Sequence, residues 1–154
     1  MTTGITSEQV KKLRAETGAP VMEVRRALME SNGDSVSAKE ILQERGLEKA
    51  AKRAERATAQ GLIEAYVHTD SRVGALVHLA CETDFVARTD EFKALAHEIV
   101  MQVASMNPQS VEELLEQEYI RDSSRQVKDL VTEVVAKTGE NVQVRQIARF
   151  ALGE

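Results

Sequence analysis

The stretch "VGALVHLAC" (residues 73–81) decides the fold class, because its side chains alternate between two faces with a period of two. Every member of one face is apolar or small: Val73, Ala75, Val77, Leu79 and Cys81. The preceding stretch "LIEAYVH" (62–68) alternates in the same way, and "TDSR" (69–72) between the two supplies residues that favour a turn. The sequence therefore predicts an antiparallel β-hairpin in the middle of the chain.

Helical patterns precede the hairpin. In residues 1–46, apolar side chains recur with helical spacing between capping and stop signals, so we expect three short helices, the first capped by Thr6 and the last ending at Gly46. The next stretch, "LEKAAKRAERATAQ" (47–60), is rich in helix-forming residues and has no large apolar residue after its first. It predicts a solvated connecting helix that ends at Gly61.

More helices and one further strand follow the hairpin. We expect a helix from Thr89 or Asp90, a short helix after Ser110, a longer helix that Gly139 ends, and a strand over residues 142–152. The resulting fold class is α+β, with a three-stranded antiparallel sheet covered by helices.

The predicted organisation has three parts. They are a three-helix module over residues 1–46, a connecting helix over 47–60 and an α+β core over 61–154. The first part is small, and we expect it to be marginally stable in isolation.

Composition narrows the class of protein. The net charge of −5 argues against a nucleic-acid binder that works by neutralising phosphates. The chain begins without an apolar signal-peptide region and has no apolar stretch long enough to span a bilayer. A single cysteine allows no intrachain disulfide. We therefore expect a soluble cytoplasmic protein that binds neither membranes nor nucleic acid.

The sequence does not indicate an enzyme. Glycines are too widely spaced for a P-loop or a G-x-G-x-x-G fingerprint, and Met101 stands where a zinc-binding motif opened by His97 and Glu98 needs a second histidine. His78 and Cys81 would point to opposite faces of a strand, which argues against a nucleophile–base pair. We expect no catalytic residue, no metal and no cofactor, and a Cys81 that is buried and structural.

The hairpin is followed by "CETDFVAR" (81–88), which places Asp84 beside Phe85 in a turn. Two interpretations remain open from the residues alone. Phe85 can fold back into the core, as most phenylalanines do. Alternatively, Asp84 and Phe85 form an exposed wedge, an apolar anchor with an adjacent carboxylate that is presented to a partner protein.

Three motifs together resemble bacterial translation elongation factor Ts: "TGAPVMEVRRAL" (17–28), "TDFVAR" (83–88) and "AKTGENVQVRQIARF" (136–150). The resemblance runs through nearly the whole chain in the same order. It implies an N-terminal bundle similar to ubiquitin-associated domains, followed by a core subdomain with a three-stranded antiparallel sheet. It also implies a nucleotide-exchange factor for the GTPase elongation factor Tu, which it would bind in the GDP-bound and nucleotide-free states.

The resemblance assigns the wedge a mechanism. In the family, the Asp-Phe pair enters the GTPase near its switch region and displaces the groups that hold magnesium, so that GDP leaves. These roles would fall on Asp84 and Phe85, with Thr83 and Val86 shaping the loop. Further partner contacts would come from the N-terminal module and from the turn before the last strand: Val21, Met22, Arg25, Thr138 and Gly139.

The resemblance also implies a homodimer. Longer members of the family carry two copies of the hairpin-plus-helix unit, and the second copy contacts the GTPase through a Tyr-x-His segment. This chain has one copy, which contains both the wedge and the segment from Tyr66 to His68. Shorter members pair two chains instead. Because Ala148 stands where some members have a cysteine that joins the subunits, we expect a non-covalent dimer here.

One alternative is a protein of another class. A chain with this N-terminal bundle could bind peptides or ubiquitin-like partners without any exchange activity, with Phe85 in the core. The two hypotheses differ in whether the chain accelerates GDP release from elongation factor Tu.

Overall fold

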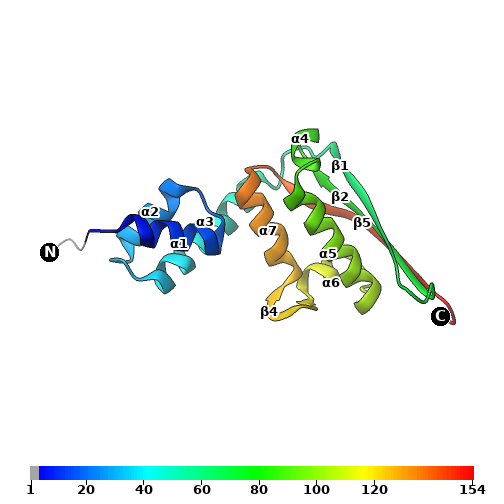
Figure 1. Cartoon of the computed structure of the whole chain (residues 1–154). Helices are drawn as coiled ribbons and strands as arrows, with labels where there is room; N and C mark the ends of the chain where they lie inside the picture. The colour runs from blue at the N-terminus through cyan, green and yellow to red at the C-terminus, as the bar shows by residue number, and fades with distance from the viewer. Residues whose placement is uncertain (1–3) are drawn as a thin grey trace.

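The computed structural model describes residues 4–154, and its centre is a three-stranded antiparallel sheet with the order β1-β2-β5 (Figure 1). The strands are β1 (Gln60–Val67), β2 (Val73–Cys81) and β5 (Val142–Ala151). β1 and β2 form the expected hairpin, and β5 is the expected third strand. The α+β class with a three-stranded antiparallel sheet is therefore confirmed.

Among the described residues, helices cover one face of this sheet and none covers the other (Figure 1). Helix α5 (Asp90–Met106) follows the wedge segment and is capped by Thr89, and α7 (Val127–Thr138) leads into β5. The core between these helices and the sheet consists of fully or nearly fully buried apolar side chains, including Val77, Leu79, Phe92, Ile99, Val103, Val127 and Val135.

The uncovered face of the sheet is largely apolar. Cross-strand partners point to the same side of a sheet, and the register places Val67 opposite Gly74, which itself pairs with Phe150. Large apolar side chains on this face are exposed to solvent: Ile63, Val67, Leu76 and Phe150. The sheet thus buries one face inside the chain and exposes these apolar side chains on the other.

A two-stranded hairpin, β3 (Glu118–Tyr119) and β4 (Asp122–Gln126), connects α6 (Val111–Glu116) to α7 and was not expected from the sequence. It is fastened to α5 by the fully buried amide of Gln102. This amide donates to the carbonyl oxygen of Glu118 at 3.0 Å and accepts from the backbone N–H of Ile120 at 3.0 Å. The strands are short and polar, so no alternation in the sequence reveals them.

The N-terminal bundle comprises α1 (Ser7–Thr17), α2 (Val21–Glu30) and α3 (Ser35–Arg53), with its own small apolar core around Leu13 and Leu28. Thr6 caps α1 in the expected capping box with Gln9. Figure 1 shows the bundle beside α7, at the opposite side of the molecule from the hairpin tip.

The expectation that Gly46 ends the third helix, with a separate connecting helix over 47–60, is wrong. Helix α3 continues without interruption to Arg53. Gly46 is buried where α3 meets α7, and a Cβ added to it would lie 4.0 Å from that of Ala136. The glycine therefore serves helix packing, and the surrounding helix formers outweigh its low propensity.

Gly61 does not end a helix either. It lies inside β1 with a φ of 146°, and the backbone of Leu79 and Ala80 in the adjacent strand leaves no room for a side chain there. Within residues 4–154, no helix combines the length and the hydropathy needed to cross a membrane.

Candidate functional site

The segment between β2 and α5 folds into a single turn of helix, α4 (Asp84–Ala87), at one end of the sheet (Figure 1). Thr83 is its N-cap, and the Thr83 hydroxyl accepts a hydrogen bond from the backbone N–H of Val86 at 3.4 Å. Phe85 is 78% exposed, whereas the next residue, Val86, packs into the core. The interpretation of Phe85 as a core residue is therefore wrong.

A carboxylate from a distant part of the sequence holds this segment in place. Glu140, in the turn between α7 and β5, accepts hydrogen bonds from the backbone N–H groups of Glu82 and Thr83 at 3.1 and 2.9 Å. Its second oxygen accepts from the Thr83 hydroxyl at 2.6 Å. In return, the carboxylate of Glu82 accepts from the backbone N–H of Asn141 at 2.7 Å. We call these four bonds the Glu82–Glu140 clasp.

Sequence reasoning missed the clasp. Glu140 lies within the quoted motif "AKTGENVQVRQIARF", but nothing in its spacing points to residues 82 and 83, which are 57 or more positions away. Only the pairing of β2 with β5, which places Cys81 opposite Val142, brings the two segments together.

Asp84 points toward solvent and pairs with Arg88, with an Oδ2–Nη2 distance of 3.2 Å. Both side chains are well exposed, so water and salt screen the pair and it contributes little to stability. The carboxylate of Asp84 is thus available to a partner at the cost of a weak ion pair only.

Cys81 is buried below the wedge, as expected, and its thiol donates to the carbonyl oxygen of Thr83 at 3.1 Å. Burial raises the pKa of the Cys81 thiol, and the negative charge of Glu140 raises it further. The thiolate that a nucleophile needs is therefore disfavoured. Cys81 supports the loop as a packed side chain.

The structure brings some of the expected contact residues together. Thr138 is the last residue of α7 and Gly139 is its C-cap, and both directly precede Glu140, which binds residues 82 and 83. Gly139 ends α7 with a φ of 74° and donates its N–H to the carbonyl oxygen of Val135. The Thr138 hydroxyl donates to the carbonyl oxygen of Val134 at 2.8 Å.

Other expected contacts lie away from the wedge. Val21, Met22 and Arg25 are exposed at the start of α2 in the N-terminal bundle. His68 directly follows β1 at the far end of the β1–β2 hairpin, so the eight residues of β1, about 26 Å of strand, separate it from the end near the wedge. Its Nδ1 is 2.8 Å from the hydroxyl of Tyr66.

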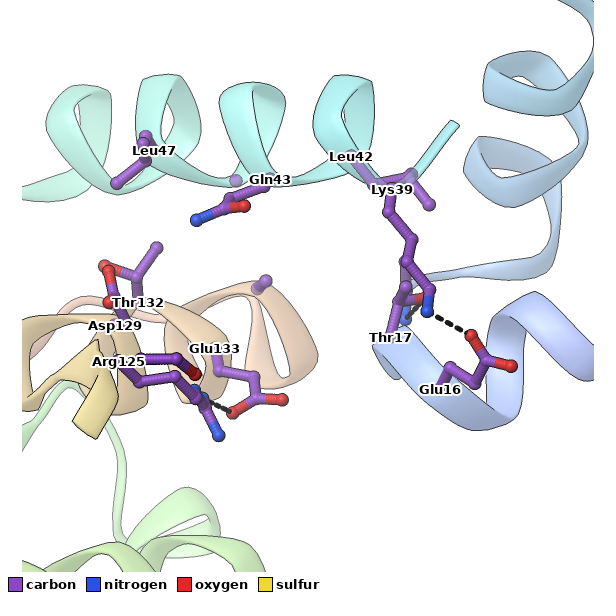
Figure 2. A pocket seen from close by; sticks show the side chains of 14 residues that line it. Glu16, Thr17, Lys39, Leu42, Gln43, Leu47, Arg125, Asp129, Thr132 and Glu133 are labelled. Carbon is purple, nitrogen blue, oxygen red and sulfur yellow. Dashed lines mark hydrogen bonds and ion pairs between the residues drawn. The ribbon is translucent and has the colours of Figure 1, made fainter. Parts of the chain in front are cut away.

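A cleft between α3 and α7 is lined by charged side chains, most of which pair with a neighbour on the same wall (Figure 2). Glu16 pairs with Lys39 on the bundle side, and Arg125 pairs with Glu133 at 2.6 Å on the core side. These four charges are therefore paired on their own sides of the cleft, and the remaining carboxylate, Asp129, accepts from the backbone N–H of Gln126 at 2.9 Å. Among residues 4–154, no three His, Cys, Asp or Glu side chains group in a way that could hold a metal ion.

Comparisons with known proteins find similarity over nearly the whole chain. A family model described as "Elongation factor TS" matches residues 82–154. Proteins named Elongation factor Ts from Thermoanaerobacter sp. (strain X514) and Coprothermobacter proteolyticus are 40% and 41% identical, and each alignment covers 97% of this chain and 96% or 99% of the relative. The Elongation factor Ts of Clostridium acetobutylicum is 48% identical over 96% of this chain and 48% of its own length.

The alignments differ in length. Those with the two shorter relatives extend over 195 positions, 41 more than the 154 residues of this chain, so these relatives carry at least that many residues that this chain lacks. The alignment with the Clostridium relative extends over 147 positions and has no such excess.

Proposed function

The chain belongs to the elongation factor Ts family, and from this membership we propose that it acts in translation elongation, in the cytoplasm, as a guanine-nucleotide exchange factor for elongation factor Tu. The observation that carries the proposal is the exposure of Phe85 on a capped helical turn. An aromatic side chain held in water by the fold around it suits insertion into another protein.

The wedge would act by inserting Phe85 near the switch region of elongation factor Tu, with Asp84 beside it, and dislodging the magnesium ion that helps to hold GDP. Burial of a phenylalanine side chain contributes about 1.5–3 kcal/mol. This corresponds to a factor of about ten to a hundred in affinity. Thr83 and Val86 would shape the loop, the first as its cap and the second as its anchor in the core.

Exchange requires that the chain bind the nucleotide-free or distorted state of its partner more tightly than the GDP-bound state. By thermodynamic linkage, the chain then weakens GDP binding by the same factor by which GDP weakens binding of the chain. The wedge would supply this difference in affinity between the nucleotide-free and GDP-bound states, because the apolar surface of Phe85 would be buried only when the switch region has moved.

The N-terminal module would supply affinity. We propose that it is similar to ubiquitin-associated domains and contacts a helix of elongation factor Tu through Val21, Met22 and Arg25, while Thr138 and Gly139 contact the same helix. The expected boundary at residue 46 falls inside α3 and the one at residue 60 at the start of β1, so a continuous helix connects the module to the core.

The chain would work as a homodimer. The apolar, exposed face of the sheet supports this proposal, because a surface of that kind is normally covered. The chain also aligns with 48% of the Clostridium relative, so a second copy could take the place of the other half. One subunit would insert Phe85 while the other presents Tyr66 and His68.

Release of a fluorescent GDP analogue from elongation factor Tu tests the proposal. We expect the chain to accelerate release at catalytic concentrations, with the same final equilibrium. If the chain binds elongation factor Tu without changing the release rate, it is a binding module and the proposal is wrong.

A further inference from the structure

We propose that Glu140 is the positioning residue of the wedge: it holds Phe85 exposed by orienting the hydroxyl that caps α4. This inference rests on the proposed exchange function and assigns to the site a residue that lies outside the "TDFV" segment.

Helix α4 cannot hold its own shape. It contains four residues, and a single helical turn is unstable alone because it fixes many backbone torsions for very few hydrogen bonds. Its first backbone N–H groups also need partners outside the helix. The cap provided by Thr83 and the packing of Val86 are therefore what keep Phe85 in position.

The hydroxyl of Thr83 has to point in one direction to act as a cap. It donates its proton to Glu140 at 2.6 Å, and this leaves its lone pairs free to accept from the backbone N–H of Val86 at 3.4 Å. A hydroxyl next to a charged acceptor is strongly oriented, and the two bonds reinforce each other. Glu140 thus acts on Phe85 through Thr83.

Glutamine cannot reproduce these bonds. The two carboxylate oxygens of Glu140 receive three donors, two on Oε1 and one on Oε2. An amide has one acceptor oxygen and one NH2 group. The backbone N–H groups of Glu82 and Thr83 would continue to donate to the amide oxygen, so the NH2 group would face the Thr83 hydroxyl. The proton of that hydroxyl would then have no acceptor on residue 140.

The same turn is fixed at its other side. Asn141, next to Glu140, donates from its side chain to the carbonyl oxygens of Ala54 and Arg56 at 3.2 and 2.8 Å. The turn that holds the wedge is thus tied to the C-terminal end of α3. Glu140 therefore keeps the wedge in a fixed position relative to Thr138 and Gly139, the second expected contact with the partner.

The experiment compares Glu140→Gln with Glu133→Gln in the full chain. Glu133 is a matched control, because it is a part-exposed carboxylate on α7 whose hydrogen bond goes to Arg125, away from the wedge. The maximal rate of fluorescent GDP release and the concentration for half-maximal release are measured for both, and thermal unfolding verifies folding.

We expect Glu140→Gln to lower the maximal rate about tenfold, the rate equivalent of one hydrogen bond to a charged group, with little change in the half-saturating concentration. Glu133→Gln should match the native chain. An unchanged maximal rate for Glu140→Gln, alongside a native chain that accelerates release, would overturn the positioning role. A native chain without any effect would instead refute the proposed function.

A double-mutant cycle with Phe85→Ala separates positioning from a general structural effect. If Glu140 acts through Phe85, the substitution Glu140→Gln should have almost no further effect on release in the Phe85→Ala background. Equal fold losses in both backgrounds would show that Glu140 acts independently of the wedge. The cycle is measured at saturating concentration, where the residual stimulation is largest.

Discussion

Phe85 and Val86 are neighbours in α4, yet 78% of Phe85 is exposed whereas 9% of Val86 is. The first presents its ring to solvent, and the second fixes the helical turn to the core formed by β2 and α5. The proposed binding role and the stabilising role thus fall on two adjacent side chains, and this division can be measured.

Phe85→Ala and Val86→Ala should affect different quantities, the first nucleotide exchange and the second stability. Phe85→Ala should reduce the stimulation of GDP release about tenfold or more, because a buried aromatic contact with the partner is lost, and it should leave the melting temperature nearly unchanged. Val86→Ala should lower the free energy of unfolding by about 1–2 kcal/mol. A large loss of stability in Phe85→Ala would show that its ring is packed in solution.

Asp84→Asn should impair exchange less than Phe85→Ala. The carboxylate of Asp84 is exposed and pairs weakly with Arg88, so its removal changes orientation and charge at the wedge but leaves the apolar anchor. Release assays with both variants under identical conditions give the ranking. A loss for Asp84→Asn that equals or exceeds that of Phe85→Ala would mean that the charge dominates.

Met22→Ala should weaken binding to elongation factor Tu without lowering the maximal release rate. The loss of one partly buried methionine contact predicts a half-saturating concentration about fivefold higher. Met29→Ala is the matched control, because the two methionines lie on α2 and are 59% and 60% exposed. Equal effects of the two variants would refute the assignment to the start of α2.

Leu76→Lys should convert the proposed dimer into a monomer. Sedimentation of the native chain at micromolar concentration should show twice the chain mass of 17.0 kDa, and the variant should show a single chain mass. A charge buried in an apolar interface is strongly unfavourable. Leu47→Lys is the control, because Leu47 is similarly exposed but lies on α3. A native chain that is monomeric and exchanges at full rate contradicts the dimer.

Tyr119→Phe should make stability less dependent on pH in the alkaline range. Burial, together with the hydrogen bond to Glu98, raises the pKa of Tyr119 to about 12. The unfolded chain therefore loses this proton before the folded chain does, and stability falls as the pH rises from 10 toward 12.

Near pH 8 the hydrogen bond should make the native chain more stable than Tyr119→Phe by about 1 kcal/mol. This advantage should shrink above pH 10. Urea unfolding of both chains at pH 8, 10 and 11 measures the difference, and a difference that stays constant across this range would contradict the role of Tyr119.

Local chemistry determined much of the fold from the sequence. The period-two alternation of residues 73–81 specified β2, because a sheet with one covered face needs apolar side chains at every second position. Thr6, Thr89 and Ser110 marked helix starts correctly, since each hydroxyl caps backbone N–H groups three residues away. Such contacts depend on near neighbours and can be read without knowledge of the fold.

Contacts between distant segments were decided by the tertiary structure alone. Gly46 does not break α3 because α7 packs against it, and β3 and β4 form because Gln102 supplies buried partners from α5. The exposure of Phe85 depends on a carboxylate, Glu140, that reaches the loop only when β5 pairs with β2. Hydrophobicity favoured a buried Phe85, and the geometry of the capped turn, which directs Val86 inward, placed the ring in solvent.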